Sequence, residues 1–265
     1  MAEDTRLVVL GSRGSIAVSG PEFLRYGGNT SSFAVAVGDR VCAFIDAGTG
    51  MVSYRSYGLH VGRSLDVFLT HYHWDHIQGL SMLEATWSQD REIVIHGPGG
   101  PRGALTAVIT PPWFPVSLAE APAVQFETIA RSTETSGMRL TPFKVEHPQG
   151  AIGYRIDGPS KSIAIVTDHE AGTGRDRAVV DAIRGVDVLV HDAQYSPIEA
   201  EDRRGWGHST WEGAIAAAEA AGVGRLVLTS LDPRSTDDDV DAIVETIRDR
   251  FPDVEAAYPG LELSL

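Results

Sequence analysis

Apolar residues fall into short runs along most of the chain, and Gly, Asp, Asn or Pro separates one run from the next. Runs rich in Val, Ile and Phe with such boundaries are typical of β-strands. The pattern predicts strands at Leu7–Leu10, Phe33–Val37, Val41–Ile45, Leu65–Leu69, Glu92–His96, Arg139–Val145, Ser162–Val166, Val186–Val190 and Arg225–Leu228. The first three of these strands lie close together in sequence and indicate a β-meander.

Three later segments have the features of helices. The clearest is Thr210–Ala221, which Ser209 or Thr210 can cap and Gly222 can end. Asp237–Arg248 begins with acidic residues and ends with a basic one, as the helix dipole favours. The third segment is Arg175–Arg184. Strands alternating with helices predict an α/β layered fold, and without a linker or repeat we expect one domain over residues 1–265.

Composition and charge limit the classes of partner. With 22 basic and 36 acidic residues the net charge is −14, which disfavours long nucleic acid and favours a small substrate. The chain has no run of 18 apolar residues, so we expect no membrane span. Its polar N-terminus does not resemble a secretory signal, and the single Cys42 excludes an internal disulfide. The cytoplasm is the expected location, and the oligomeric state is left open.

The segment Thr70–His76, directly after the apolar run Leu65–Leu69, holds three of the nine histidines. Imidazole and carboxylate groups together suit Zn²⁺. His71 and His73 are two residues apart and point to the same side of an extended chain, whereas Asp75 and His76 turn toward a second point. The spacing therefore predicts a site for two metal ions with a bridging hydroxide.

With this motif the chain resembles the metallo-β-lactamase fold superfamily of hydrolases over nearly its whole length. The segments Gly11–Ser15, Tyr26–Ser32 and Phe44–Gly50 are also similar to those of the family. The resemblance implies a four-layer αβ/βα sandwich with the metals in a cleft at one edge. It also implies that Asp46 organises the metal loop, that His147 is the third ligand of the first metal, and that Asp168 bridges the two ions. The implied ligand set is His71, His73, Asp75, His76, His147 and Asp168, with Asp75 also counted as catalytic.

The chain departs from the family pattern at Ser230. The family usually places a metal-binding histidine after its last central strand, where this chain reads Leu228-Thr229-Ser230. A serine hydroxyl is a poor ligand for zinc, so we expect one or two zinc ions, with the second site weakened or lost. His169, Asp232 or a water molecule could complete that site.

The segment Gly207-His208-Ser209-Thr210 is similar to one in the ribonuclease Z-like phosphodiesterases of the superfamily. The resemblance implies that His208 lies near the scissile phosphate and gives a proton to the leaving oxygen. The alternative is that His208 is a turn residue beside an ordinary helix cap. His147 and Asp168 are only 21 positions apart, which leaves room for a β-hairpin but not for the long arm with which those enzymes grip tRNA.

The expected reaction is therefore the hydrolysis of a small, anionic phosphodiester, such as a cyclic nucleotide or a cyclic ribose phosphate, by a metal-bound hydroxide. Two alternatives stay open. Trp74, Trp113 and Phe114 could line an apolar wall for a lactone, thioester or β-lactam substrate, although such aromatic residues are more often packing residues. The chain could also be a binding protein descended from an enzyme, with Ser230 as the trace of lost metal chemistry.

Overall fold

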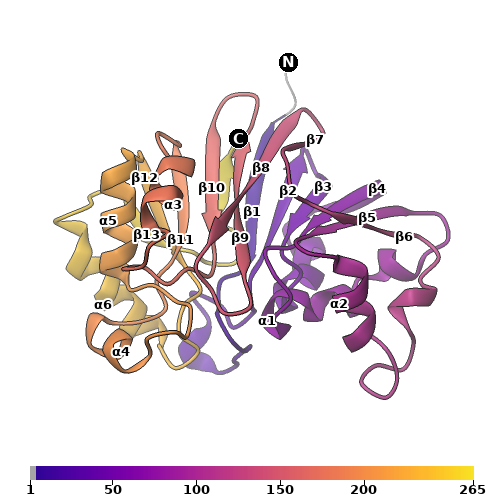
Figure 1. The fold of residues 1–265 in the computed structure, drawn as a ribbon, viewed down its shortest axis with the longest axis horizontal. Helices are drawn as coiled ribbons and strands as arrows, with labels where there is room; N and C mark the ends of the chain where they lie inside the picture. The colour runs from indigo at the N-terminus through magenta and orange to yellow at the C-terminus, as the bar shows by residue number, and fades with distance from the viewer. Residues whose placement is uncertain (1–3) are drawn as a thin grey trace.

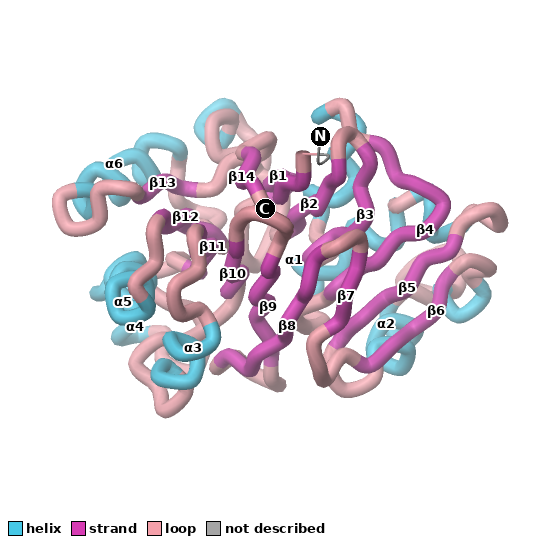
Figure 2. Tube along the Cα trace, turned by 90° about the horizontal axis from the view of Figure 1, so that it is seen from above, coloured by secondary structure: helices cyan, strands magenta, loops and turns pink. Residues whose placement is uncertain are grey.

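The computed structural model describes residues 4–265, which form two mixed β-sheets facing each other with helices outside (Figure 1, Figure 2). The first sheet has the order β14 (Glu262–Ser264), β1 (Thr5–Gly11), β2 (Ser32–Val37), β3 (Arg40–Ile45), β4 (His60–Phe68), β5 (Glu92–Gly97) and β6 (Val124–Thr128). The second has the order β13 (Val254–Ala256), β12 (Arg225–Thr229), β11 (Val188–Asp192), β10 (Ser162–Val166), β9 (Ala151–Asp157), β8 (Met138–Val145) and β7 (Thr133–Thr135).

Alternating side chains of the strands build two kinds of core. Leu7 and Val9 of β1 join a cluster between the sheets, together with Ile163 of β10 and Val190 of β11. Val8, on the opposite face of β1, packs in a second cluster beneath the helical segments that cover the first sheet. The central strands are thus buried on both faces, which explains why they are apolar almost throughout instead of alternating.

The helices form the outer two layers. Their bounds are α1 (Trp74–Ile77), α2 (Pro101–Val108), α3 (Asp176–Ala182), α4 (Pro197–Asp202), α5 (Trp211–Ala221) and α6 (Asp237–Arg248). Figure 1 shows α3, α5 and α6 on one side of the strands and α1 and α2 on the other. A 3₁₀ segment, Thr49–Tyr57, also packs on the first sheet. The predicted four-layer sandwich is therefore confirmed.

All nine predicted strands and all three predicted helices are present, several with shifted ends. Thr210 caps α5 by accepting a hydrogen bond from the Gly213 amide at 3.0 Å, and Gly222 ends the helix at a φ of 67°. The pattern missed five strands and three helices, which are β6, β7, β9, β13, β14, α1, α2 and α4. Over residues 4–265, no helix combines the length and apolar character needed to cross a bilayer.

Parallel pairing brings distant segments to one edge. β3 to β6 run parallel in the first sheet, and β10 to β13 run parallel in the second. Residues that follow the carboxyl ends of parallel strands meet at the same edge, which is where α/β folds commonly place their sites. Asp46 follows β3, the His71–His76 segment follows β4, and Asp168 and Ser230 follow β10 and β12.

Candidate metal centre

The histidines and aspartates of the motif converge in two groups of potential ligand atoms. In each group, the ligand atoms all lie within 4.8 Å of one another. The first group is His71, His73, His147 and Asp168; the second is Asp75, His76 and Asp168. The structure therefore brings together all six residues that the resemblance implied, and it places Asp168 in both groups.

Asp168 lies between the two groups and presents a different carboxylate oxygen to each. Its Oδ2 lies 3.6 Å from Nε2 of His71 and 3.4 Å from Nε2 of His147. Its Oδ1 lies 3.3 Å from Nε2 of His76. This is the position expected for a carboxylate shared by two cations.

A separate hydrogen bond or close polar contact fixes the outward nitrogen of each imidazole. His147 donates from Nδ1 to the carbonyl oxygen of Gly207 at 2.8 Å, and Nδ1 of His76 lies 2.7 Å from Oδ2 of Asp46. The remaining pairs are His71 Nδ1 with Thr70 Oγ1 at 3.0 Å and His73 Nε2 with Gln149 Oε1 at 2.9 Å. Partners of this kind orient metal-ligating histidines in proteins.

Asp46 acts as the implied organiser of the loop. Beyond its contact with His76, its Oδ1 accepts a hydrogen bond from the Thr70 amide at 2.8 Å, and both of its oxygens lie within 3.0 Å of the Thr70 hydroxyl. Asp46 has a φ of 55°, so the chain turns sharply directly after β3. Asp75 is held by the Ser15 amide, which donates to its Oδ2 at 2.8 Å.

The residues present fit a bound cation. Among residues 4–265, the Nε2 atoms of His71 and His76 are buried and have no hydrogen-bond partner, although both face carboxylates. Burying such a group without a partner is costly, and a metal ion at this point would remove the cost. Three imidazoles and a carboxylate in the first group are a donor set that suits zinc.

The pKa values support this fit. Burial, and then the charge of His76, lowers the pKa of His71 well below its usual range, so its ring is neutral and can act as a ligand. Burial opposes charge on His76, but the carboxylates of Asp46 and Asp168 raise its pKa well above the usual range. Burial also opposes charge on Asp168, yet His76 and His208 hold the pKa of that carboxyl well below its usual range. The second group therefore attracts positive charge strongly.

Ser230 lies at the second group without belonging to it. Its hydroxyl donates to the carbonyl oxygen of Thr167, and its Oγ is 3.5 Å from Oδ1 of Asp168. The two protein residues considered as substitutes are engaged elsewhere. Nε2 of His169 is 3.3 Å from Asp176, and Oδ1 of Asp232 accepts from Nε of Arg234 at 2.9 Å.

We expect Ser230→His to raise the affinity of the second group for zinc by about 10- to 100-fold, the range commonly found for a ligand or its support. Histidine tolerates the positive φ of 53° at this position better than most residues do. The affinity is measured by titrating zinc into metal-free protein. Ser230→Ala is the matched control, because it removes the hydroxyl without adding a ligand. Equal affinities in the histidine variant and the wild type would show that another group already completes the site.

His208 lies beside the centre and is oriented by Asp192, a residue that sequence reasoning missed. Nδ1 of His208 is 3.0 Å from Oδ2 of Asp192, and its Nε2 faces Oδ2 of Asp168 at 4.0 Å. Burial opposes charge on His208, but Asp192 and Asp168 raise its pKa to about 9. The imidazole is therefore protonated at neutral pH.

Asp192 is itself held firmly. Its carboxylate accepts hydrogen bonds from the amides of His169, Ser209 and Gln194 at 3.0–3.1 Å. The sequence offered one signal for Asp192, which is its position at the end of a parallel strand. Such an aspartate lies at the same edge of the sandwich as Asp46 and Asp168. His208 is thus a carboxylate-bound imidazole beside the two groups of potential ligand atoms.

Known proteins share the fold of this chain and, at low identity, its sequence. A ribonuclease Z from Haloarcula marismortui is 28% identical to this chain, over 97% of this chain and 96% of its own length. A diphosphatase of the PhnP family is 21% identical, with a TM-score of 0.74 over 98% of each chain. Zinc-bound PqqB from Methylobacterium extorquens is 20% identical, with a TM-score of 0.74 over 98% of this chain and 100% of its own.

The family comparison covers the central part of the chain. A family model described as a beta-lactamase superfamily domain matches residues 43–229, which run from within β3 to the end of β12 and include both groups of potential ligands. Together with the ribonuclease Z relative, this match confirms the resemblance found in the sequence. The chain belongs to the beta-lactamase superfamily.

Proposed function

We propose that this protein is a zinc-dependent hydrolase that cleaves a small, anionic phosphodiester. The observation that carries the proposal is the His208–Asp192 pair, which presents Nε2 of His208 toward Asp168 beside both groups of potential ligands. An imidazole held by a carboxylate on one nitrogen can give a proton from the other. A phosphodiester with a poor leaving group needs such a donor.

The six ligating residues would hold one or two zinc ions. A divalent ion there would neutralise charge on the phosphate oxygens and lower the pKa of a water molecule so that it becomes a nucleophile at neutral pH. Asp46, Thr70 and Gly207 hold the imidazoles in their ligating orientation through the contacts described above. Asp192 fixes the ring of His208, which then protonates the oxygen that leaves phosphorus.

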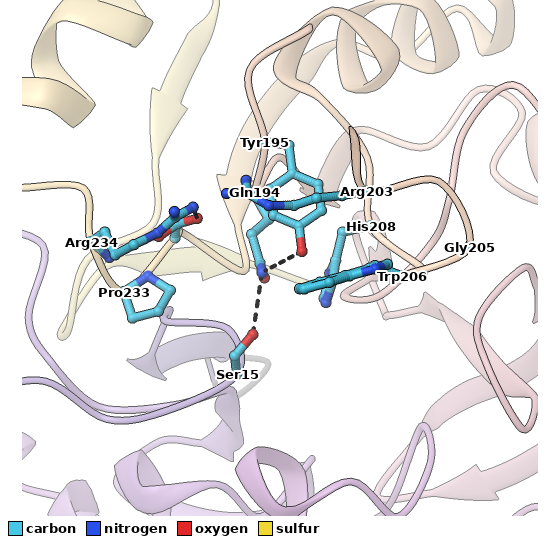
Figure 3. A pocket seen from close by; sticks show the side chains of 10 residues that line it. Ser15, Gln194, Tyr195, Arg203, Gly205, Trp206, His208, Pro233 and Arg234 are labelled. Atoms are coloured by element: carbon cyan, nitrogen blue, oxygen red, sulfur yellow. Dashed lines mark hydrogen bonds and ion pairs between the residues drawn. The ribbon is translucent and has the colours of Figure 1, made fainter. Parts of the chain in front are cut away.

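A cavity beside His208 supports a small substrate. It has a volume of about 590 Å³ and is lined by Ser15, Gln194, Tyr195, Arg203, Trp206, His208 and Arg234, among others (Figure 3). Volumes of this size accommodate small-molecule ligands. The guanidinium groups of Arg203 and Arg234 can contact an anionic ligand, although both also contact Glu199, at 3.1 and 3.2 Å, and Arg234 pairs with Asp232 of the same cavity.

The segment between His147 and Asp168 also supports a small substrate. It forms β9 and β10, a hairpin within the second sheet, as its length predicted. This leaves no extended arm at that position among the described residues. Together with the net charge of −14, the hairpin favours a small phosphodiester over tRNA.

The three aromatic residues that the sequence offered as an apolar wall for carbonyl substrates lie outside this cavity. Within residues 4–265, none of Trp74, Trp113 and Phe114 lines it. Trp113 is 73% exposed, and Phe114 stacks on Trp87 with ring centroids 6.0 Å apart. Most of the side chains that line the cavity can form hydrogen bonds or carry a charge, as recognition of a phosphodiester requires.

Replacing His208 with alanine tests the proposal. We expect kcat/KM for phosphodiesters with alkyl-like leaving groups to fall by about 10²–10⁴, the usual contribution of general acid catalysis. The loss should be much smaller for p-nitrophenolate, which departs without a proton. Zinc content should stay normal because His208 belongs to neither group of ligands. Steady-state kinetics on both substrate types, with metal analysis of each protein, make the comparison.

A lactone and a thioester are assayed in parallel. Turnover of only these two substrates would contradict the proposal and support a carbonyl hydrolase. An equal loss for both phosphodiester types in His208→Ala would show that His208 does not act as the proton donor.

A further inference from the structure

Trp206 is a large apolar side chain left exposed on the cavity beside the metal ligands. It lines the same cavity as His208, two residues further along the chain, yet it is 61% exposed (Figure 3). Exposing an indole to water forfeits the free energy that its burial would give. An exposed apolar surface beside a reaction centre is therefore a candidate contact for a ligand.

The backbone around Trp206 is held on both sides. The amides of Gly205 and Gly207 donate to the two carboxylate oxygens of Glu170, at 2.8 and 2.9 Å. The Trp206 amide itself donates to the carbonyl oxygen of Arg203 at 3.1 Å. Because one carboxylate ties both neighbours of Trp206, the indole is attached to a fixed segment of chain.

The same segment is joined directly to the metal centre. The carbonyl oxygen of Gly207 accepts the hydrogen bond from Nδ1 of His147. Gly207 has a φ of 86°, and a Cβ atom there would come within 2.2 Å of His147 Nδ1, so only glycine allows this approach. The backbone that carries the indole therefore has a set position relative to the third histidine of the first group. A surface fixed in advance binds a flat ligand without a further cost of ordering.

The opposite wall of the cavity is polar. Gln194 donates from Nε2 to Oγ of Ser15 at 3.2 Å and to the hydroxyl of Tyr195 at 3.3 Å. Ser15, Gln194 and Tyr195 thus bring three linked hydrogen-bonding groups to the lining of the cavity. A ligand that fills this space thus meets one flat apolar face and one wall of hydrogen-bonding groups.

We infer that the substrate is a phosphodiester that carries a nucleobase, and that Trp206 is the surface on which the base stacks. The inference rests on the proposed function and narrows it to nucleoside-bearing substrates. A purine or pyrimidine ring offers a flat π-face to the indole and polar edges to the opposite wall. A sugar phosphate without a base leaves the indole uncovered.

Two cyclic phosphodiesters that differ only in the base provide the test. They are adenosine 2′,3′-cyclic phosphate and methyl riboside 2,3-cyclic phosphate. In both, water adds to phosphorus, one ring P–O bond breaks, and the leaving ribose oxygen takes a proton. We expect the zinc-loaded wild type to prefer the adenosine compound by about tenfold or more in kcat/KM. In Trp206→Ala the ratio should fall close to one, and Trp206→Phe should retain part of it. Trp113→Ala is the matched control, because its indole is also exposed but lies outside this cavity.

A binding measurement separates this inference from the proposed function. The matching products, adenosine 3′-monophosphate and methyl riboside 3-phosphate, are titrated into the zinc-loaded protein in a calorimeter. We expect the adenosine compound to bind more tightly, and Trp206→Ala to weaken it by about 5- to 150-fold. If the adenosine product binds tightly through Trp206 but neither cyclic compound is hydrolysed, the nucleobase-stacking role of Trp206 stands and the proposed phosphodiesterase activity is contradicted. If the two cyclic compounds are hydrolysed equally and the two products bind equally, the nucleobase-stacking role of Trp206 is contradicted and the proposed phosphodiesterase activity stands.

Discussion

Replacing His73 with alanine is expected to abolish zinc binding at the first group of ligands and hydrolysis with it. Nδ1 of His73 lies 3.0 Å from Nε2 of His147, and Gln149 contacts the other nitrogen of the His73 ring. These two contacts orient Nδ1 of His73 toward the other potential ligands of the first group. Without this ring, two imidazoles and a shared carboxylate remain. Because a bound metal ion contributes several kcal/mol to catalysis, kcat/KM should fall by about 10³-fold or more.

Metal analysis and kinetics on the purified variant check this result. His60→Ala is the matched control, since His60 is an exposed histidine at the start of β4, the strand that leads into the motif. The control should keep its full metal content and activity. Unchanged zinc content in His73→Ala would refute the assignment of His73 as a ligand.

Asp168→Asn is expected to have a broader effect, because Asp168 belongs to both groups. Asparagine keeps the size of the side chain but removes the negative charge that faces His71, His76 and His147. The variant therefore lacks the one carboxylate that both groups of potential ligands share. We expect zinc content to fall at both groups and kcat/KM to drop by about 10³-fold or more.

Zinc stoichiometry distinguishes the two variants. His73→Ala leaves Asp75, His76 and Asp168 in place, so any ion at the second group should remain, whereas Asp168→Asn should lose both. Asp157→Asn is the control, because Asp157 is a partly exposed aspartate of β9 that contacts Arg155. If Asp168→Asn kept the same zinc content as the wild type, Asp168 could not be the shared ligand.

The sequence pattern identified the buried strands well because their apolar runs are continuous. It failed where polar residues take part in a strand. β11 was expected at Val186–Val190 but is Val188–Asp192, since His191 and Asp192 pair with β12 although they read as loop residues. β4 begins five residues earlier than expected, at His60, because its first half pairs with β3 and β5 while exposing polar side chains.

The candidate site divides in the same way. Residues within one motif, such as His71 and His76, could be identified from local spacing, and His147 and Asp168 from their resemblance to the family. Asp192 was missed although it ends a parallel strand, because its contact with His208 depends on the path of the chain between β11 and α5, which no local pattern encodes. Glu170 was missed for a similar reason, since its bonds to Gly205 and Gly207 join segments about 35 residues apart.

The potential metal ligands are divided between the two sheets. His71, His73, Asp75 and His76 follow a strand of the first sheet, whereas His147 and Asp168 follow strands of the second. An ion held by both sets would act as a non-covalent cross-link across the interface, and its binding free energy would add to that of sheet docking. Resistance to heat would then rise and fall with the supply of metal, so a shortage of the ion would shorten the lifetime of the folded protein as well as remove any activity that needs the ion.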